Sequence, residues 1–504
     1  MEIIAIIHIC ADSVRMIQIK LNRDNAYNLI EKYREPIDIF GKLDSNGNIL
    51  SDAISSLITI LKNFQSICEA KKVDKSIIIG TETLRSVSNS NIVVDLIKKK
   101  VGIPIELISE EQQCYYDMLS NSAFVEYPNG LIFDLSAGSF QLIHMKHRTM
   151  ESFYSFPEGA IQLGHVFGDT SLSKEEKENK VNAIADRVIQ QVPWLSKLEN
   201  LPVIAMGRNI RYIARLDMYL RKYPLDIVHG YSIDIDRIDY LYENFNLEVL
   251  EDWEKHEDIE HDYNILLGAI FFTKTLLQKL SVSSITISGN GLKEGVFYNY
   301  LMKEKKLIIR SPLMHSIENI IKLMELDSLH AFQIRWLAME IFTNIREVLN
   351  LPETTDIDLH QIVNTSALLH DSGSVINYYN HHHHSFWVIL NSPICGLTHK
   401  ELLMSAYIAS FHRKNNSYIT FEQYSEILTE DNINIIRKLG VILKLAESLD
   451  KRMDNVVKNI DFTITDTEIV MEISASIYLD MELRDASRIL DEFETIIGKK
   501  LILK

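Results

Sequence analysis

The chain has 504 residues, of which 46% are hydrophobic and 24% are charged, and its formal net charge is −17. Single hydrophobic cores rarely grow beyond ~250–300 residues, so this length predicts several domains. The negative charge argues against broad binding to DNA. No run of apolar residues is long enough to predict a transmembrane helix.

Cysteine usage and the N-terminal residues together predict a cytoplasmic protein. The four cysteines lack the paired spacing of a disulfide framework, which indicates a reducing compartment. The first apolar run follows Glu2 and ends before Asp12, so it is interpreted as a core strand and not as a signal peptide. The cysteines are Cys10, Cys68, Cys114 and Cys395.

The first 125 residues alternate between predicted strands and helices, a pattern typical of α/β domains. The turn between the first two strands is His8-Ile9-Cys10-Ala11-Asp12-Ser13. The strands are expected at 3–7, 14–19, 77–79 and 105–108, and the helices at 90–99 and 110–119.

Residues 131–142 predict a buried strand that ends at Asp134 and turns sharply on Ser136-Ala137-Gly138-Ser139 before the next strand. A turn of small residues exposes a row of backbone N–H groups, and such a row can bind a phosphate. Because the turn at residues 8–13 is a degenerate copy of this arrangement, we expect a duplicated fold that handles phosphates or nucleotides.

The rest of the chain completes a four-domain prediction. Further strands at 131–133, 203–205 and 284–287 give a second α/β lobe, and a cleft is expected between the two lobes. After about residue 305 helices dominate, for example at 330–349, 361–370 and 398–411. A small α+β domain is expected last, with strands at 460–464, 469–473 and 501–503 and a helix at 483–497. The predicted domains are 1–125, 126–304, 305–455 and 456–504.

Several sequence motifs occur along the chain in a definite order. Residues 80–89 resemble Ala-Thr-x-x-Leu-Arg-x-Ala-x-Asn, and residues 105–109 resemble the start of Ile-Glu-Ile-Ile-Ser-Gly-x-Glu-Glu-Ala. Residues 134–142 resemble Asp-Ile-Gly-Gly-Gly-Ser-Thr-Glu-Leu, and residues 288–295 resemble Ser-Gly-x-Gly-Leu-Arg-Glu-Gly. The helical part adds, in this order, His330-Ala331, Leu368-Leu369-His370-Asp371, His382-His383-His384-Ser385 and His412-Arg413-Lys414. The order of these motifs resembles that of the exopolyphosphatase/guanosine pentaphosphate phosphohydrolase (Ppx/GppA) family.

This resemblance implies two actin-like lobes of the sugar-kinase/Hsp70/actin superfamily, an all-α HD-type domain and a homodimer. The implied reaction is release of the terminal phosphate from polyphosphate or guanosine pentaphosphate. Arg85 would hold phosphate oxygens, and Asp134 would bind Mg²⁺ or position water. The implied phosphate-binding set is Arg85, Ser13, Ser136, Ala137, Gly138 and Ser139. The alternative for Arg85 is an ordinary arginine at the start of a surface helix.

The chain departs from the family pattern where catalysis needs carboxylates. His8 replaces the aspartate of the first turn, Gln112-Gln113 replaces a Glu-Glu pair, and Gln141 replaces a glutamate. A glutamine amide can hold a water but cannot take its proton, and Mg²⁺ prefers anionic oxygen ligands. We therefore expect lost or greatly reduced hydrolysis and a weakened Mg²⁺ site. His8 is a candidate base, although a histidine at a strand end is more often structural.

The helical part keeps a candidate metal site. His330, His370, Asp371 and Glu447 occur in the order of an HD-type site, and this mixture of imidazole and carboxylate suits a divalent transition metal. His382, His384 and His412 are candidates for a second site, and the alternative is that all these residues only pack inside a helical bundle.

Three functional hypotheses follow. The chain is an enzyme with residual hydrolysis at Asp134 and Arg85, a pseudoenzyme that senses a phosphorylated ligand, or a metal-dependent HD phosphohydrolase. The carboxylate losses favour the second hypothesis over the first, and the set containing His370 and Asp371 supports the third.

Overall fold

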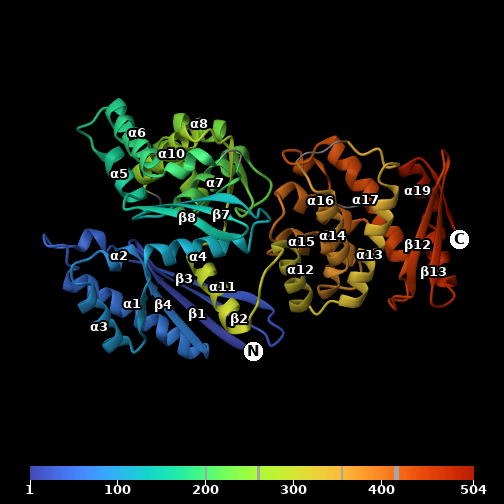
Figure 1. Ribbon diagram of the computed structural model, residues 1–504, viewed down its shortest axis with the longest axis horizontal. Coiled ribbons are helices and arrows are strands. Elements are labelled where there is room, and N and C mark those ends of the chain that lie inside the picture. Colours follow the sequence, from blue (N-terminus) through green and yellow to red (C-terminus); the bar gives the residue numbers. More distant parts are fainter. Residues whose placement is uncertain (199–200, 258–261, 353–355, 414–418) are drawn as a thin grey trace. The chain divides into compact units, whose positions relative to one another are not determined.

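The computed structural model describes residues 1–198, 201–257, 262–352, 356–413 and 419–504 (Figure 1). The chain divides into two compact units, Met1–Pro312 and Leu313–Lys504. Within the described ranges, no helix combines the length and the apolar character needed to cross a bilayer. The predicted boundaries at residues 125, 304 and 455 stay predictions.

The first sheet of the N-terminal unit is built around strand β1 (Glu2–Ile9). Strand β1 is antiparallel to β2 (Ser13–Leu21) and parallel to β4 (Lys75–Gly80). Side chains of β1 alternate between two hydrophobic cores, with Ile4 and Ile6 in one and Ala5 and Ile7 in the other, so both faces of this strand are covered. Strands β3 (Tyr27–Pro36) and β5 (Ile105–Leu107) complete the order β3-β2-β1-β4-β5.

The second sheet repeats this arrangement. Strand β6 (Gly130–Leu135) is antiparallel to β7 (Phe140–Lys146) and parallel to β9 (Val203–Met206). The order is β10-β11-β9-β6-β7-β8, with β8 (Thr149–Phe156), β10 (Ser232–Asp234) and β11 (Ser284–Ile287). Since β6 with β7 and β9 matches β1 with β2 and β4, the predicted duplication of an α/β lobe is confirmed.

Helices cover both sheets (Figure 1). Helices α4 and α11 approach so closely that a Cβ added at Gly295 would overlap the Tyr116 carbonyl. The helices of this unit are α1 (Ser51–Ala70), α2 (Glu82–Arg85), α3 (Ser90–Val101), α4 (Glu110–Ser122), α5 (Ala160–Gly168), α6 (Lys174–Gln191), α7 (Arg208–Arg221), α8 (Ile235–Asn244), α9 (Leu247–Glu257), α10 (Tyr263–Lys279) and α11 (Leu292–Lys305), with 3₁₀ turns at Phe40–Lys42 and Pro193–Lys197.

The second unit is helical up to Leu449, and its longest helix, α17 (Glu430–Leu449), is buried along most of its length. The other helices are α12 (Pro312–Leu323), α13 (Ser328–Ile345), α14 (Leu359–Leu369), α15 (His381–Asn391) and α16 (His399–Ser410), with 3₁₀ turns at Ser372–Val375 and Glu422–Tyr424.

A three-stranded sheet follows, in which β13 (Glu468–Ala475) lies between β12 (Val457–Ile464) and β14 (Lys500–Leu503). The single helix predicted at 483–497 is wrong. The structure has α18 (Asp480–Ser487) and α19 (Leu490–Ile497), because the amides of Arg488 and Ile489 bond three residues back and end the first helix in a tight turn.

Candidate functional site

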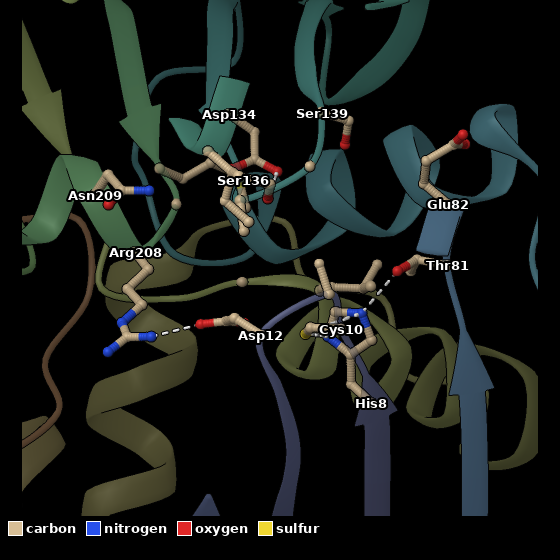
Figure 2. A pocket seen from close by; sticks show the side chains of 18 of the residues that line it. His8, Cys10, Asp12, Thr81, Glu82, Asp134, Ser136, Ser139, Arg208 and Asn209 are labelled. Atoms are coloured by element: carbon tan, nitrogen blue, oxygen red, sulfur yellow. Dashed lines mark hydrogen bonds and ion pairs between the residues drawn. The ribbon is translucent and has the colours of Figure 1, made fainter. Parts of the chain in front are cut away.

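A cavity of about 230 Å³ lies where corresponding turns of the two repeated sheets meet (Figure 2). Its lining includes the β1–β2 turn and the β6–β7 turn, together with the residues that follow the parallel strands β4 and β9. Ligands of open α/β sheets bind outside the carboxyl ends of the strands, where this cavity lies.

The turn after β6 forms one wall, as predicted for Ser136, Ala137, Gly138 and Ser139, all of which line the cavity. The amide of Ser136 donates to the Ser139 carbonyl at 3.0 Å, and the carbonyls of Ser136 and Ala137 accept the first amides of α5. Gly159 permits this packing, since a Cβ there would lie 2.4 Å from the Ser139 nitrogen. The turn at residues 136–139 is therefore held in place by the N-terminus of α5.

Two buried carboxyl groups, Asp134 and Asp117, also line the cavity. Burial raises the pKa of Asp134 to about 6, although the Ser136 hydroxyl, which donates to it at 3.1 Å, acts in the opposite sense. Burial and the neighbouring Asp134 raise the pKa of Asp117 well above its ordinary value. Among described residues, nothing donates a hydrogen bond to either carboxyl oxygen of Asp117 or to Oδ1 of Asp134. These unpartnered oxygens fit a hard cation such as Mg²⁺.

Four basic residues that the sequence analysis missed surround these carboxyls: Arg15, Arg208, Arg211 and Lys293. Arg208, at the start of α7, pairs at 2.5 Å with Asp12 of the β1–β2 turn, so the pair joins the two lobes across the cavity (Figure 2). Asp12 also contacts Arg15 at 3.1 Å. Lys293 lies in the motif at residues 288–295, and Arg208 and Arg211 are three residues apart on one face of a helix.

His8 lines the cavity, and its imidazole is neutral. Its Nε2 is 3.2 Å from the Thr81 hydroxyl, and its Nδ1 is 3.2 Å from the Cys10 sulfur (Figure 2). Burial, and then the positive charges of Lys293 and Arg15, lower the pKa of His8 well below its ordinary value. A neutral imidazole beside a thiol cannot replace the negative charge of an aspartate.

Arg85 and Ser13 do not belong to the cavity lining. The Arg85 guanidinium donates to the Ile108 carbonyl at 2.7 Å and pairs with Glu82 and Glu110. The Ser13 hydroxyl donates to Asp12 at 2.9 Å. The cationic side chains of the cavity are therefore three other arginines and Lys293, and not the predicted Arg85.

The two glutamines predicted as degenerate catalytic positions also lie outside the lining. Gln112 caps its own helix, accepting the Ser109 amide at 2.9 Å, and the neighbouring Gln113 enters the cavity instead. One residue along a helix rotates a side chain by about 100°, which separates these positions. Gln141 donates to the Ser139 hydroxyl at 2.8 Å and so supports the turn from behind.

In the second unit, the predicted residues His330, His370, Asp371 and Glu447 converge. Oε2 of Glu447 lies 3.2 Å from Nε2 of His330 and 3.1 Å from Nε2 of His370. Asp371 Oδ2 lies 3.6 Å from the same nitrogen of His370. Burial alone would lower the pKa of His330, but the carboxylates of Asp450 and Glu447 raise it to about 10.

A second group adjoins the first, with His381 in place of the predicted His382 and His384. Asp371 Oδ1 lies 2.9 Å from Nε2 of His381 and 3.5 Å from Nε2 of His412. His381 is the first residue of α15 and contacts Asp371, whereas the ring of the buried His382 packs 6.1 Å from that of His412. Lys414 of the quoted motif lies outside the described residues. We call these six residues the histidine cluster: His330, His370, Asp371, His381, His412 and Glu447.

Comparison with protein families gives two matches. The model described as "Ppx/GppA phosphatase family" matches residues 19–304, and that described as "Ppx/GppA phosphatase, domain III" matches residues 313–487.

Known proteins agree with these matches. A guanosine-5'-triphosphate,3'-diphosphate pyrophosphatase of Pseudoalteromonas atlantica is 22% identical over 474 residues, which cover 90% of this chain and 88% of that protein. The structure of the Aquifex aeolicus Ppx/GppA family member is 21% identical with a TM-score of 0.53, covering 60% of this chain and 98% of that one. An exopolyphosphatase structure from Cytophaga hutchinsonii is 20% identical with a TM-score of 0.54 and the same coverage. These structures share the predicted α/β fold.

Proposed function

The chain belongs to the Ppx/GppA phosphatase family, and we propose that its cavity binds the terminal phosphate of polyphosphate or of a phosphorylated guanine nucleotide with greatly reduced hydrolysis. The observation that carries this proposal is the lining itself, which keeps four cationic side chains and a phosphate-type turn but presents Gln113 and neutral His8.

The binding part rests on charge and shape. Guanidinium groups form strong, charge-assisted hydrogen bonds with phosphate oxygens, and Arg208, Arg211 and Lys293 line the same cavity as the turn at residues 136–139. Asp134 and Asp117 would hold Mg²⁺, which would neutralise phosphate charge next to these side chains.

The weak hydrolysis follows from the missing base. A water attacking phosphorus must be oriented and must lose its proton, and acid–base assistance contributes typically ~10²–10⁴-fold. With Asp134 and Asp117 assigned to the cation, Gln113 and neutral His8 offer no strong base for the attacking water. A chain that binds but barely turns over its ligand acts as a sensor.

Binding and phosphate release, measured separately, test this function. We expect saturable calorimetric binding of polyphosphate or guanosine pentaphosphate, weakened in Arg211→Gln, with little phosphate released in Mg²⁺. Rapid Mg²⁺-dependent release that is lost in Asp134→Asn would overturn the reduced-hydrolysis part. An absence of binding to either ligand would overturn the whole proposal.

A second candidate function belongs to the helical unit, as a metal-dependent HD-type phosphohydrolase. The supporting observation is that Nε2 of His330, Nε2 of His370 and a Glu447 oxygen lie within 4.8 Å of one another, with Asp371 alongside. A divalent transition metal held there would supply a Lewis acid. Manganese-dependent phosphate release that survives Asp134→Asn and is lost in His370→Asn would support it, and the reverse pattern would exclude it.

The cytoplasmic location and the homodimer stay proposals. None of the four cysteines, all of which lie in the described ranges, forms a disulfide bond, as a reducing compartment requires. Size-exclusion chromatography with light scattering would test the dimer.

A further inference from the structure

We propose that the Cys10 thiol attacks the terminal phosphorus of a phosphate chain bound in the cavity and keeps the phosphoryl group as phosphocysteine. The proposal rests on the phosphate binding proposed for the cavity, and it adds a covalent step to that function. The products are a modified protein and a ligand that is shorter by one phosphate. Little free phosphate is released, because a water that would hydrolyse the phosphocysteine still lacks a base.

Cys10 differs from the other cysteines in its position. It follows the last residue of β1, at the carboxyl end of the strand, and its amide donates to the Ser13 carbonyl at 2.9 Å, which fixes the β1–β2 turn. Cys10 is half-buried and lines the cavity, whereas the other three are buried outside the lining. Of these four cysteines, Cys10 is therefore the one that a ligand in the cavity can contact.

A chain of hydrogen bonds orients a base toward this thiol. The Thr81 hydroxyl donates to the Ile9 carbonyl at 3.5 Å, so its oxygen is left to accept from Nε2 of His8, 3.2 Å away. With the ring hydrogen on Nε2, the lone pair is on Nδ1. Nδ1 is also the ring nitrogen nearer to the Cys10 sulfur, at 3.2 Å against 3.5 Å (Figure 2). The thiol can thus give its proton to His8.

A nucleophile, a base and a group that orients the base are the usual parts of a site for covalent catalysis. Burial raises the pKa of Cys10, against the positive charges of Arg15 and Lys293, so the resting side chain is a neutral thiol. A neutral thiol needs a base as it attacks, and the neutral ring of His8 is the form that accepts a proton. Because burial lowers the pKa of His8, this base is weak and we expect the attack to be slow.

The rest of the cavity gives independent evidence for a ligand opposite the thiol. Oδ1 of Asp134 and Oε1 of Gln113 have no hydrogen-bond partner within the part of the chain that the structure describes, although these residues are only 3% and 5% exposed. Figure 2 shows His8 and Cys10 on one side of the cavity and Asp134 on the other. A phosphate between these sides faces the sulfur, and Arg15 in the same lining would offset the charge of its oxygens during transfer.

The proposed step balances without a further reactant. The bond between Sγ of Cys10 and phosphorus forms while the bridging P–O bond of the terminal phosphate breaks. The electron pair of the broken bond stays on the bridging oxygen, which becomes a terminal oxygen of the shortened ligand. The thiol proton moves to Nδ1 of His8 and from there to this oxygen or to solvent. Since Gln113 cannot take a proton from water, the phosphocysteine accumulates.

Mass spectrometry of the full chain tests the proposal, with polyphosphate and guanosine pentaphosphate as separate probes in Mg²⁺. We expect one phosphoryl group per chain, which peptide analysis places on Cys10, and with guanosine pentaphosphate an equal amount of guanosine tetraphosphate. Calorimetric binding of both probes with no phosphoryl group on Cys10 would overturn the covalent step and leave the proposed function standing. An absence of binding to either probe would overturn both.

Cysteine variants identify the nucleophile. Cys10→Ser should lose the phosphoryl group, because a hydroxyl gives up its proton much less readily than a thiol. Cys68→Ser, which changes a cysteine outside the lining, should keep it. A phosphoryl group that persists in Cys10→Ser, or that is lost from both variants, would contradict the assignment. Circular dichroism checks folding, and the peptide analysis of the parent protein needs no variant.

The rate at which the phosphoryl group appears tests the two residues behind the thiol. His8→Asn should lower this rate by ~10²–10⁴-fold, because it removes the base. Thr81 acts through His8 and is a positioning residue. Thr81→Val should therefore lower the rate by ~10-fold, and Thr81→Ser, which keeps the hydroxyl, should restore it. An unchanged rate in His8→Asn would overturn the role of His8, and equally slow Thr81→Ser and Thr81→Val variants would overturn that of Thr81.

Discussion

The cavity of the N-terminal unit and the histidine cluster of the helical unit differ in the kinds of side chain that they bring together. The cavity keeps cations, with Arg15, Arg208, Arg211 and Lys293 around a phosphate-type turn, but its glutamine and histidine lack negative charge. The cluster keeps carboxylates and imidazoles and has one nearby arginine. The first arrangement suits an anion, beside a cation that Asp134 and Asp117 would hold, whereas the second suits a cation alone.

In the two proposed functions, this difference separates phosphate recognition in the cavity from metal-dependent chemistry at the histidine cluster. At a site that attracts phosphate but lacks a strong base, the ligand binds but is hydrolysed slowly. A site built of imidazole and carboxylate binds metal first and meets phosphate through it. Substitution of side chains at one site should therefore leave the binding properties of the other site unchanged.

The largest expected effect comes from returning carboxylates to the cavity. We expect His8→Asp with Gln113→Glu to raise Mg²⁺-dependent phosphate release from polyphosphate by ~10²–10⁴-fold, because both a cation ligand and a base are restored. Phosphate release under steady-state conditions measures this gain.

Gln112→Glu is the matched control, since a glutamate also caps the helix at this position without entering the cavity. A gain in the control, or none in the double variant, would mean that turn geometry and not charge limits the reaction.

The next effect is loss of metal from the histidine cluster. Asp371→Ala removes both facing oxygens and should weaken Mn²⁺ binding by at least ~100-fold, while polyphosphate binding in the cavity stays the same. Equilibrium dialysis and calorimetry measure the two properties separately. A parallel loss of polyphosphate binding would show that the sites are coupled.

A smaller effect is expected from a single cavity cation. Arg211→Gln should weaken polyphosphate binding by ~10–100-fold, the usual range for a lost charge-assisted hydrogen bond. Arg85→Gln serves as the comparison, because its guanidinium lies outside the lining and should leave affinity nearly unchanged. The opposite ranking in calorimetric titrations would return the phosphate-binding role to Arg85.

The smallest effect concerns a histidine of the helical unit outside the cluster. Burial lowers the pKa of His315 to about 4 from its ordinary 6.5, so the unfolded state binds the extra proton between these values. The contribution of neutral His315 to the free energy of unfolding is therefore complete above pH 6.5 and is lost as the pH falls toward 4. We expect this loss to be about 2 kcal/mol, after allowance for the partial exposure of the side chain.

Thermal unfolding at pH 7.5 and pH 5 measures this change. His315→Gln should reduce the difference between the two unfolding temperatures, whereas exposed His165→Gln should not. If the difference between the two unfolding temperatures is as large in His315→Gln as in the parent protein, other groups cause the acid sensitivity.

Residues with a strong local signal could be predicted from the sequence. The strand and turn around Asp134 are specified by an apolar run followed by small residues, and the structure has them as predicted. The order of His330, His370, Asp371 and Glu447 likewise predicted a convergence that the structure contains.

Other site residues depend on contacts that no short pattern specifies. Gln113 and Asp117 share a helix face because they are four residues apart, a signal obscured by the neighbouring Gln112. His381 stands in a run of four histidines, where sequence alone cannot tell which ring faces the cluster. Arg208 becomes a cavity residue only when the second lobe lies beside Asp12.

In the Asp12–Arg208 pair, the Asp12 carboxylate competes with any anionic ligand for the Arg208 guanidinium. Because this carboxylate is part of the chain, it acts at an effective concentration in the millimolar range or above. A single inorganic phosphate gains little by displacing it, whereas a chain of phosphates can hold Arg211 and Lys293 while it exchanges with Asp12. The cavity should therefore respond to the length of a phosphate chain more than to its concentration.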